Sequence, residues 1–268
     1  MKILYLDCSS GICGNMVLGA LTDILEDKAY LIHELSKLHI DGYKVNISKK
    51  LCCGVESIFV DVTVDGIDEY GHEHHIEGQQ HHHEHRNLAD VNKIIDDSDL
   101  SERVKELAKR IFMRVAIAES KVHGKKLDEV HFHEVGAIDS IIDIVGTAIL
   151  VCKINPNKII SSVVNEGHGF IKCAHGIMSV PVPATSEIFA NGNVKFKQID
   201  VDTELVTPTG AAIVAELAQE FRTIPEMIIS KVGWGAGSKE LKIPNYLKVY
   251  LGDSEETGNP SKFNMYVI

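Results

Sequence analysis

The 268-residue chain has no apolar run of the roughly 18 to 20 residues that a membrane-spanning helix needs. Its first residues hold one lysine and only a short apolar run before Asp7, which is not the pattern of a signal peptide. Basic residues are in deficit, because 27 Lys and Arg stand against 38 Asp and Glu and give a net charge of −11. This deficit argues against a nucleic acid or an anionic membrane as partner, since both bind a basic face.

The six cysteines include no CxxC pair and show no spacing typical of a disulfide framework. Unpaired thiols are typical of a reducing compartment, so we expect the protein in the cytoplasm. Most of the cysteines are expected to be small buried apolar residues. Cys8 and Cys13 are partial exceptions, because they flank a glycine-containing loop.

The fold expected from the hydrophobic pattern is mixed α/β (α+β). Residues 2–7 predict a buried strand that leads through a loop into a helix over 16–25, and residues 43–51 and 55–65 predict an antiparallel strand pair. Further helices are expected over 30–38, 87–95, 101–122, 138–151, 184–190 and 208–218, and strands over 158–165, 195–199, 227–232 and 247–251.

The composition changes after residue 152, where glycine and proline turns become frequent. We therefore expect two parts, with a boundary near 153–157. They are an N-terminal α/β part over 1–152 that carries a disordered histidine-rich loop over 66–86, and a glycine- and proline-rich α+β part over 153–252, followed by a tail over 253–268.

Histidine is concentrated in the segment GHEHHIEGQQHHHEH. Half of the 14 histidines lie there, namely His72, His74, His75, His81, His82, His83 and His85. Imidazole binds Ni, Zn, Cu and Fe, so this density predicts a metal-collecting segment. The donors do not identify the metal, and a solvated polar loop that binds metal only adventitiously is the alternative.

A second group of candidate metal ligands lies in VHFHEVGAIDSIIDIVG. His131 and His133 are two residues apart, so they share one face of an extended segment, and Glu134 follows them. Asp139 lies on the next helix, one turn before Asp143. His131, His133, Glu134 and Asp139 together predict a divalent metal site. The alternative for Asp139 is that it only favours the helix N-terminus, whereas Asp143 in an apolar helix needs a buried partner.

Two helix starts are candidate anion sites, because backbone N–H groups and the helix dipole favour an anion there. The first is the loop DCSSGICGN, with Ser9, Ser10, Gly11, Gly14 and Asn15. The second is TELVTPTGAA, with Thr207, Thr209 and Gly210. A plain structural turn is the alternative for each, as it is for GHGFIKCAHG and for GWGAG.

These segments, in this order, resemble the nickel insertion protein family, the LarC proteins. The resemblance is carried by YLDCSSGICGNMVLGAL, the histidine-rich insertion, HFHEVGAIDSIIDIVG, GHGFIKCAHGIMSVPVPAT, TPTGAA and GWGAG, over about residues 4–237. Family members have an aspartate more often than Asn15 and a tyrosine more often than Trp234. Neither difference removes a group on which the interpretation depends.

The resemblance implies insertion of nickel into pyridinium-3,5-bisthiocarboxylic acid mononucleotide, which makes the nickel-pincer nucleotide used by lactate racemase and related enzymes. The activity would be that of a nickel chelatase, a cyclometallase of the lyase class, which consumes CTP with Mn²⁺ or Mg²⁺ and has the racemase as acceptor. Family members usually continue into a C-terminal domain associated with the CTP site. This chain stops at Ile268. The CTP site is therefore expected outside it, a separate C-terminal polypeptide is a candidate partner, and activity of the chain alone is not implied.

The implied reaction assigns roles to the candidate residues. A nickel–carbon bond forms only if a ring proton leaves, so a base is needed, and His133 or Glu134 is the expected one. The nucleotide phosphate would lie at SSGICGN or at TPTG. Two rival functions stay open: a nickel metallochaperone or storage protein without catalysis, and a metal-dependent phosphoester hydrolase.

Overall fold

The computed structural model describes residues 1–64, 86–130, 132, 135, 137–173 and 176–255. In this part of the chain, the largest sheet has the strand order β2-β3-β10-β11-β1-β4-β9. Its strands are β1 (Lys2–Asp7), β2 (Tyr43–Cys52), β3 (Val55–Val64), β4 (Lys158–Ser161), β9 (Glu220–Phe221), β10 (Ile228–Ala236) and β11 (Tyr246–Asp253). The sheet is mixed, because β1 is antiparallel to β11 but parallel to β4. Strands from both sides of the expected boundary near 153–157 share it.

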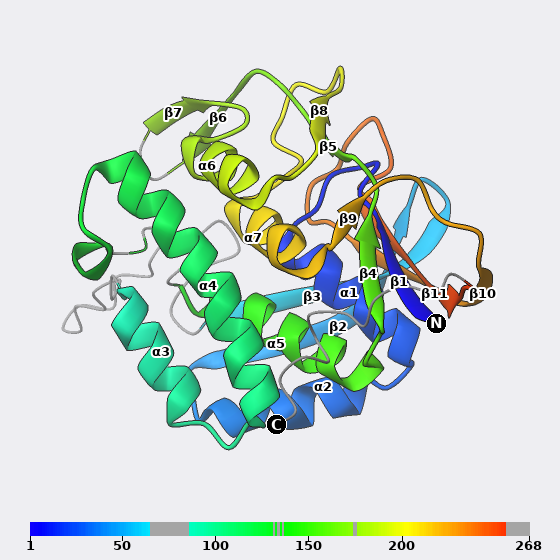
Figure 1. The fold of residues 1–268 in the computed structure, drawn as a ribbon, viewed down its shortest axis with the longest axis horizontal. Coiled ribbons are helices and arrows are strands. Elements are labelled where there is room, and N and C mark those ends of the chain that lie inside the picture. The colour runs from blue at the N-terminus through cyan, green and yellow to red at the C-terminus, as the bar shows by residue number, and fades with distance from the viewer. Residues whose placement is uncertain (65–85, 131, 133–134, 136, 174–175, 256–268) are drawn as a thin grey trace.

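The helices pack in successive layers from the sheet outward (Figure 1). Helix α1 packs on β3, β10 and β11, α5 packs on α1, and α4 covers α5 and contacts α6 and α7. The helices are α1 (Gly14–Leu25), α2 (Lys28–Leu35), α3 (Leu88–Asp96), α4 (Glu102–His123), α5 (Ile138–Ile154), α6 (Pro183–Gly192) and α7 (Pro208–Leu217), with 3₁₀ turns η1 (Ser36–Leu38) and η2 (Leu127–Glu129). Mixed α/β is therefore confirmed. No helix in the described ranges is long and apolar enough to cross a membrane.

Alternation along β1 separates two cores. Leu4 and Leu6 face the helices and belong to the main core, whereas Ile3 and Tyr5 face the other side and form a small cluster with Ile160. Helix α5 is buried almost all round, which explains its apolar sequence, because α1 and α4 enclose it.

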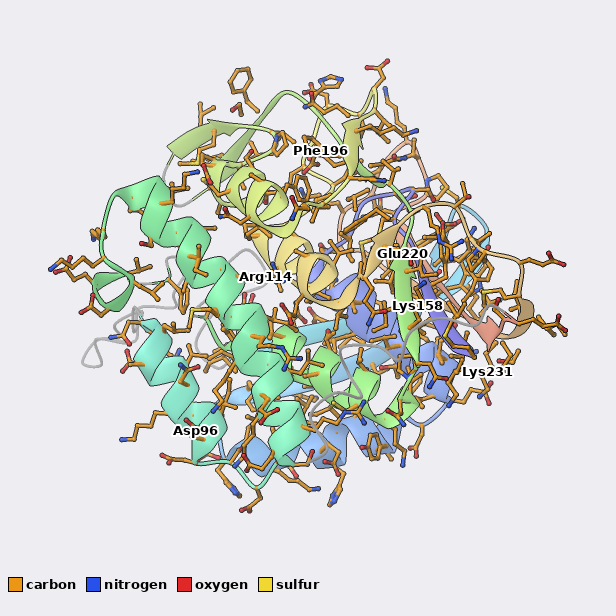
Figure 2. All side chains as sticks on the ribbon, viewed as in Figure 1. Asp96, Arg114, Lys158, Phe196, Glu220 and Lys231 are labelled. Carbon is orange, nitrogen blue, oxygen red and sulfur yellow. The ribbon has the colours of Figure 1, made fainter. Side chains whose placement is uncertain are left out.

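Ion pairs join the outer elements. Arg110 and Arg114 on α4 both bind Glu216 on α7, at 2.8 and 2.6 Å. Lys158 on β4 pairs with Glu220 on β9, and Figure 2 labels both of these side chains and Arg114. These contacts are partly exposed, so each contributes little to the free energy of unfolding.

Two local expectations need correction. The predicted strand over 158–165 is two strands, because β5 (Val164–Glu166) leaves the large sheet and pairs with β8 (Phe196–Gln198). GWGAG is not a turn but the end of β10, where glycines let α1 lie directly on the strand: a Cβ on Gly235 would be 1.8 Å from the carbonyl oxygen of Met16. A hairpin of β6 (Phe170–Cys173) and β7 (Gly176–Ser179) completes the strands of the described residues.

Candidate functional site

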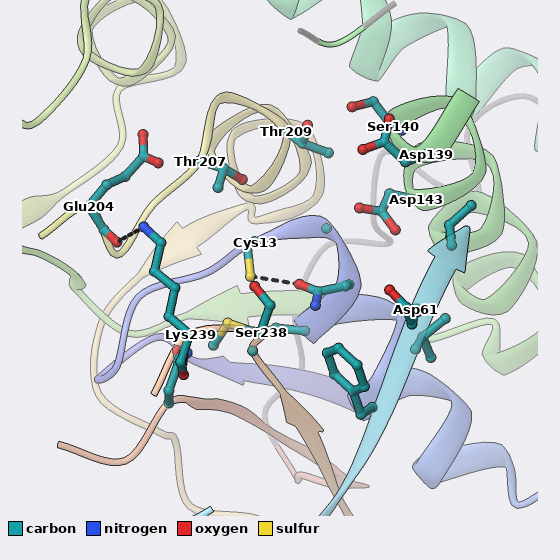
Figure 3. Close-up of a pocket in the computed structure, with 18 of the residues that line it drawn as sticks. Cys13, Asp61, Asp139, Ser140, Asp143, Glu204, Thr207, Thr209, Ser238 and Lys239 are labelled. Atoms are coloured by element: carbon teal, nitrogen blue, oxygen red, sulfur yellow. Dashed lines mark hydrogen bonds between the residues drawn. The ribbon is translucent and has the colours of Figure 1, made fainter. Parts of the chain in front are cut away.

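A cavity of about 370 Å³ lies where helices α1, α5 and α7 begin. Strand β3 and the segment after β10 form its other sides. Its size is that of pockets that bind small organic ligands. Figure 3 shows much of its lining, which includes the polar residues Cys13, Asn15, Asp61, Asp139, Ser140, Asp143, Glu204, Thr207, Thr209, Ser238, Lys239 and Asn245.

The three helix starts differ in what they present to the cavity. At α5 the Asp139 carboxylate accepts the N–H of Ser140 at 2.7 Å. At α1 the Asp143 carboxylate lies so close to Gly14 that a Cβ added there would be 2.1 Å from Asp143 Oδ2. Two of the positive helix ends thus already face a carboxylate, which is a favourable arrangement.

The start of α7 presents hydroxyls instead. The Thr207 hydroxyl accepts the N–H of Gly210 at 3.2 Å, and Pro208 has no N–H to satisfy. The Thr209 side chain also lines the cavity there. Of the three helix starts, α7 is therefore the one best suited to an added anion.

Three carboxylates gather at one end of the cavity, which we call the acidic end: Asp61 on β3, and Asp139 and Asp143 on α5 (Figure 3). The Asp143 Oδ1 atom is buried and has no hydrogen-bond partner in the described structure. Burial and then the charge of Asp139 raise the pKa of Asp143 well above its ordinary value. Asp139 is open to water in the cavity, yet the protein atoms around it also raise its pKa, against the opposing N–H of Ser140.

Lys239 stands at the opposite end, on the far side of the cavity in Figure 3, and it is the one cation among the described lining residues. Its Nζ donates to the carbonyl oxygen of Glu204 at 3.2 Å and to Thr203 Oγ1 at 3.4 Å. Lys239 therefore connects the segment after β10 with the segment that leads into α7. The cavity thus has three carboxylates at one end and Lys239 beside Glu204 at the other.

Glu166 holds the segment before α7 in place. Its Oε1 accepts the N–H groups of Gly167, Leu205 and Val206 at 2.8, 2.8 and 3.2 Å. Burial raises the pKa of Glu166, although these three N–H groups oppose the rise. The carboxylate therefore positions Thr207, the next residue after Val206, at the cavity.

Cys13 is a thiol rather than a thiolate near neutral pH. Burial raises its pKa to about 12, and the neighbouring Asp143 carboxylate adds to the rise, while a backbone hydrogen bond from Met16 opposes it. Its Sγ donates to Asn15 Oδ1 at 2.9 Å. This geometry makes Cys13 a hydrogen-bond donor in the cavity.

Iodoacetamide should accordingly alkylate Cys13 at least about tenfold more slowly than the exposed Cys53 at neutral pH, because the thiolate is the nucleophile. Peptide mapping by mass spectrometry during the reaction measures both rates in one sample, with Cys53 as the internal control. Equal rates at the two sites would contradict the assignment.

The sequence-predicted anion residues divide into two groups. Gly14, Asn15, Thr207 and Thr209 line the cavity, whereas Ser9, Ser10, Gly11 and Gly210 do not. Gly11 has φ +84°, and a Cβ there would be 2.1 Å from the carbonyl oxygen of Leu205. A Cβ on Gly210 would be 2.1 Å from that of Ile12. These two glycines thus let the two predicted anion loops pack against each other, and a role in binding stays a prediction.

Most of the predicted metal ligands lie outside the residues that the structure describes. His131, His133 and Glu134, and all seven histidines over 72–85, lie outside the described residues, while Asp139 and Val135 line the cavity. Val135 follows Glu134 directly in the sequence. Within the described ranges, no group of three or more His, Cys, Asp or Glu is placed to hold a metal ion.

Sequence reasoning missed several lining residues, above all Asp61 and Lys239. Asp61 occupies an ordinary polar position of an alternating strand, and Lys239 lies in no recognisable motif. Asp143 did carry a signal, since an acidic residue in an apolar helix requires an explanation. Only the packing of α1 against α5 shows which cavity it lines.

Comparison with known proteins identifies the family of this chain. Residues 4–268 match the model of the family described as nickel insertion protein. The chain belongs to this family. It is 47% identical over 257 residues to the pyridinium-3,5-bisthiocarboxylic acid mononucleotide nickel insertion protein of Acetivibrio thermocellus, and 45% identical over 276 residues to that of Clostridium acetobutylicum. The predicted family resemblance is confirmed.

These alignments cover 96% and 95% of this chain but 61% and 65% of the two relatives. The chain thus spans less than two thirds of the length of these nickel insertion proteins. No solved structure matches it significantly.

Proposed function

We propose that this chain carries the nucleotide-binding and nickel-handling part of an enzyme that inserts nickel into pyridinium-3,5-bisthiocarboxylic acid mononucleotide. Relatives that align with almost the whole chain are named for that activity. The observation that carries the proposal is the cavity at the three helix starts, with Lys239, Glu204 and two threonine hydroxyls at one end and three carboxylates at the other. The phosphate of a mononucleotide would lie at the end with Lys239 and the hydroxyls.

The phosphate lies at the start of α7 in this proposal. Backbone N–H groups at a helix start and the Thr207 and Thr209 hydroxyls are donors that suit a phosphate. Lys239 supplies the charge, and a phosphate would replace its bonds to Glu204 and Thr203. Gly14 and Asn15 line the same cavity.

The nickel lies beside the ring, held transiently by His131, His133 and Glu134 with Asp139. Two nickel–sulfur bonds form to the thiocarboxylates. The nickel–carbon bond forms as the ring C–H bond breaks and its proton passes to His133 or Glu134. Support for this placement comes from Val135, which directly follows Glu134, and from Asp139, because both line the cavity.

The remaining details of the proposed reaction are those that the family resemblance implies. The reaction is a cyclometallation of the lyase class that consumes CTP with Mn²⁺ or Mg²⁺, and the product passes to a racemase. The CTP site belongs to the region that makes the relatives longer than this chain, whether on the same or on a separate polypeptide. All six cysteines are free, which supports a cytoplasmic location.

Product formation tests this proposal. The chain is incubated with the nucleotide, Ni²⁺, CTP and Mg²⁺, with and without the C-terminal region of a longer relative, and the nickel-containing product is measured by mass spectrometry. Nickel binding without product in either mixture would favour a storage protein. Release of inorganic phosphate from phosphoesters with Mn²⁺ or Zn²⁺, without nickel product, would favour a hydrolase.

The histidine-rich segment collects nickel in this proposal. Replacing all seven histidines over 72–85 with glutamine should lower the number of Ni²⁺ ions bound in calorimetry and raise the nickel concentration needed for half-maximal insertion. The rate at saturating nickel should not change, because the reaction takes place in the cavity. Loss of insertion at saturating nickel would contradict a purely collecting role.

A further inference from the structure

The acidic end of the cavity affects which nucleotides the cavity binds. We propose that Asp139 and Asp143 recognise the positive charge of a pyridinium ring, so that the cavity selects a pyridinium nucleotide over a neutral-ring nucleotide with the same phosphate. This inference rests on the proposed function, since the nucleotide of that function contains such a ring. It adds a role for the acidic end, which neither the family nor the names of the relatives assign.

The charge of the cavity is unbalanced. Asp61, Asp139 and Asp143 gather at one end, and Lys239, the cation among the described lining residues, stands at the other end beside Glu204. Asp143 Oδ1 is buried without a hydrogen-bond partner, which is an unfavourable state for a carboxylate. A cation placed beside Asp143 removes that penalty, because it supplies the opposite charge that the buried oxygen lacks.

The acidic end suits an organic cation better than a metal ion. The described acidic residues are not placed to hold a metal ion as a group of three. An aromatic cation needs no such convergence, because its charge spreads over a ring several ångströms wide. Phe59 also lines the cavity, two residues before Asp61 on β3, so the two side chains lie on one face of the strand. The Lys50 ammonium already lies 5.1 Å from the centre of the Phe59 ring, so this ring has one cation on it. The carboxylates of the acidic end therefore carry the recognition of the pyridinium charge.

The two ends of the cavity are separated, as the two charges of a pyridinium mononucleotide are. In a pyridinium mononucleotide the ribose separates the ring nitrogen from the phosphate, so the ligand has a cationic and an anionic end. With the phosphate at α7 and Lys239, the ring extends towards α5. The phosphate end then contributes equally to the binding of any nucleotide with that phosphate. Only the acidic end interacts differently with a charged ring and a neutral ring.

The matched ligands for the test are nicotinamide mononucleotide and its reduced dihydro form. They share the phosphate, ribose and amide and differ in the ring charge. Calorimetry is run at about pH 8, because a higher pH favours the ionised form of a carboxyl and the reduced nucleotide stays intact there. The chain should bind the oxidised nucleotide about tenfold more tightly than the reduced one, and Asp143→Asn should reduce this preference to about threefold or less.

Two further variants separate the ends of the cavity. Lys239→Gln should weaken the binding of both nucleotides by the same factor and preserve their ratio, because the lysine faces the shared phosphate. Asp41→Asn, at an exposed position away from the cavity, should change neither affinity. Circular dichroism and the thermal midpoint of each variant confirm that it is folded.

Equal affinity of the original chain for the two nucleotides, or binding of neither at millimolar concentration, would overturn the inference. A full preference that survives both Asp143→Asn and Asp139→Asn would overturn it too. Its failure is distinct from failure of the proposed function. A charge preference in a chain that forms no nickel product would refute the function alone, and nickel insertion without a charge preference would refute this inference alone.

Discussion

Replacing Gly235 with alanine should destabilise the protein by about 3 kcal/mol or more, at the upper end of overpacking effects. A Cβ on Gly235 would be 1.8 Å from the carbonyl oxygen of Met16 and 2.4 Å from the backbone nitrogen of Ala20. Both atoms belong to the backbone of α1, so no side-chain rotation relieves the clash and the helix itself must move. For a domain of this size the thermal midpoint should fall by about 6–12 °C.

The same movement should reach the cavity. Helix α1 begins with Gly14 and Asn15, which line the cavity, so a shift of the helix displaces this wall. Nucleotide affinity should fall even under conditions where the variant remains folded. Differential scanning calorimetry measures the midpoint, and isothermal titration with nicotinamide mononucleotide measures the affinity.

The control lies on the same strand. Ile228 is 82% exposed at the other end of β10, so Ile228→Ala should leave the midpoint within a few degrees of the original and should not alter nucleotide binding. A Gly235→Ala variant as stable as the control would show that α1 is not held against β10 as closely as described.

Much of the fold follows from the sequence, because each helix and strand has its own local pattern. Asn87 predicts the start of α3 and forms a reciprocal capping box with Asp90 there. Pro208 likewise stands at the first turn of α7. The order of the strands is a different matter: the sequence contains no local signal that β1 lies between β11 and β4, since residues far apart in the chain determine that pairing.

The candidate site is predictable only in part, for the same reason. Gly14, Asn15, Asp139, Thr207 and Thr209 belong to segments with a helix-start pattern, and they meet at one cavity. Lys239 and Asp61 meet them only through tertiary packing, without a pattern of their own. The glycines of the two anion loops illustrate the converse, because Gly11 and Gly210 have a packing reason that fully explains a glycine there.

His133→Ala and Glu134→Gln should each reduce the rate of nickel insertion strongly, and the variant that removes the base should do so by about 10²- to 10⁴-fold. The reason is the chemistry of the proposed reaction, in which the ring carbon between the two thiocarboxylates loses its proton as the nickel–carbon bond forms. The assay uses the chain together with the C-terminal region that completes the longer relatives, with nickel at saturation.

Two measurements distinguish a base from a nickel ligand. A base gives a rate that rises with pH through its pKa, and its removal flattens that profile and increases the kinetic isotope effect of a substrate deuterated at the reacting carbon. A ligand changes the nickel concentration that supports half-maximal insertion. In a chain whose histidines over 72–85 are replaced by glutamine, calorimetry with Ni²⁺ reports that second effect without interference from the collecting segment.

The matched control is His168→Ala. His168 is partly exposed, its Nε2 lies 3.0 Å from Asp200 Oδ1, and it does not line the cavity, so this variant should retain full activity. If both His133→Ala and Glu134→Gln retained the rate and the pH profile of the original, the base would have to be another group of the cavity. The carboxyls of Asp139 and Asp143 would then be the next variants to examine, because the surrounding protein raises the pKa of both.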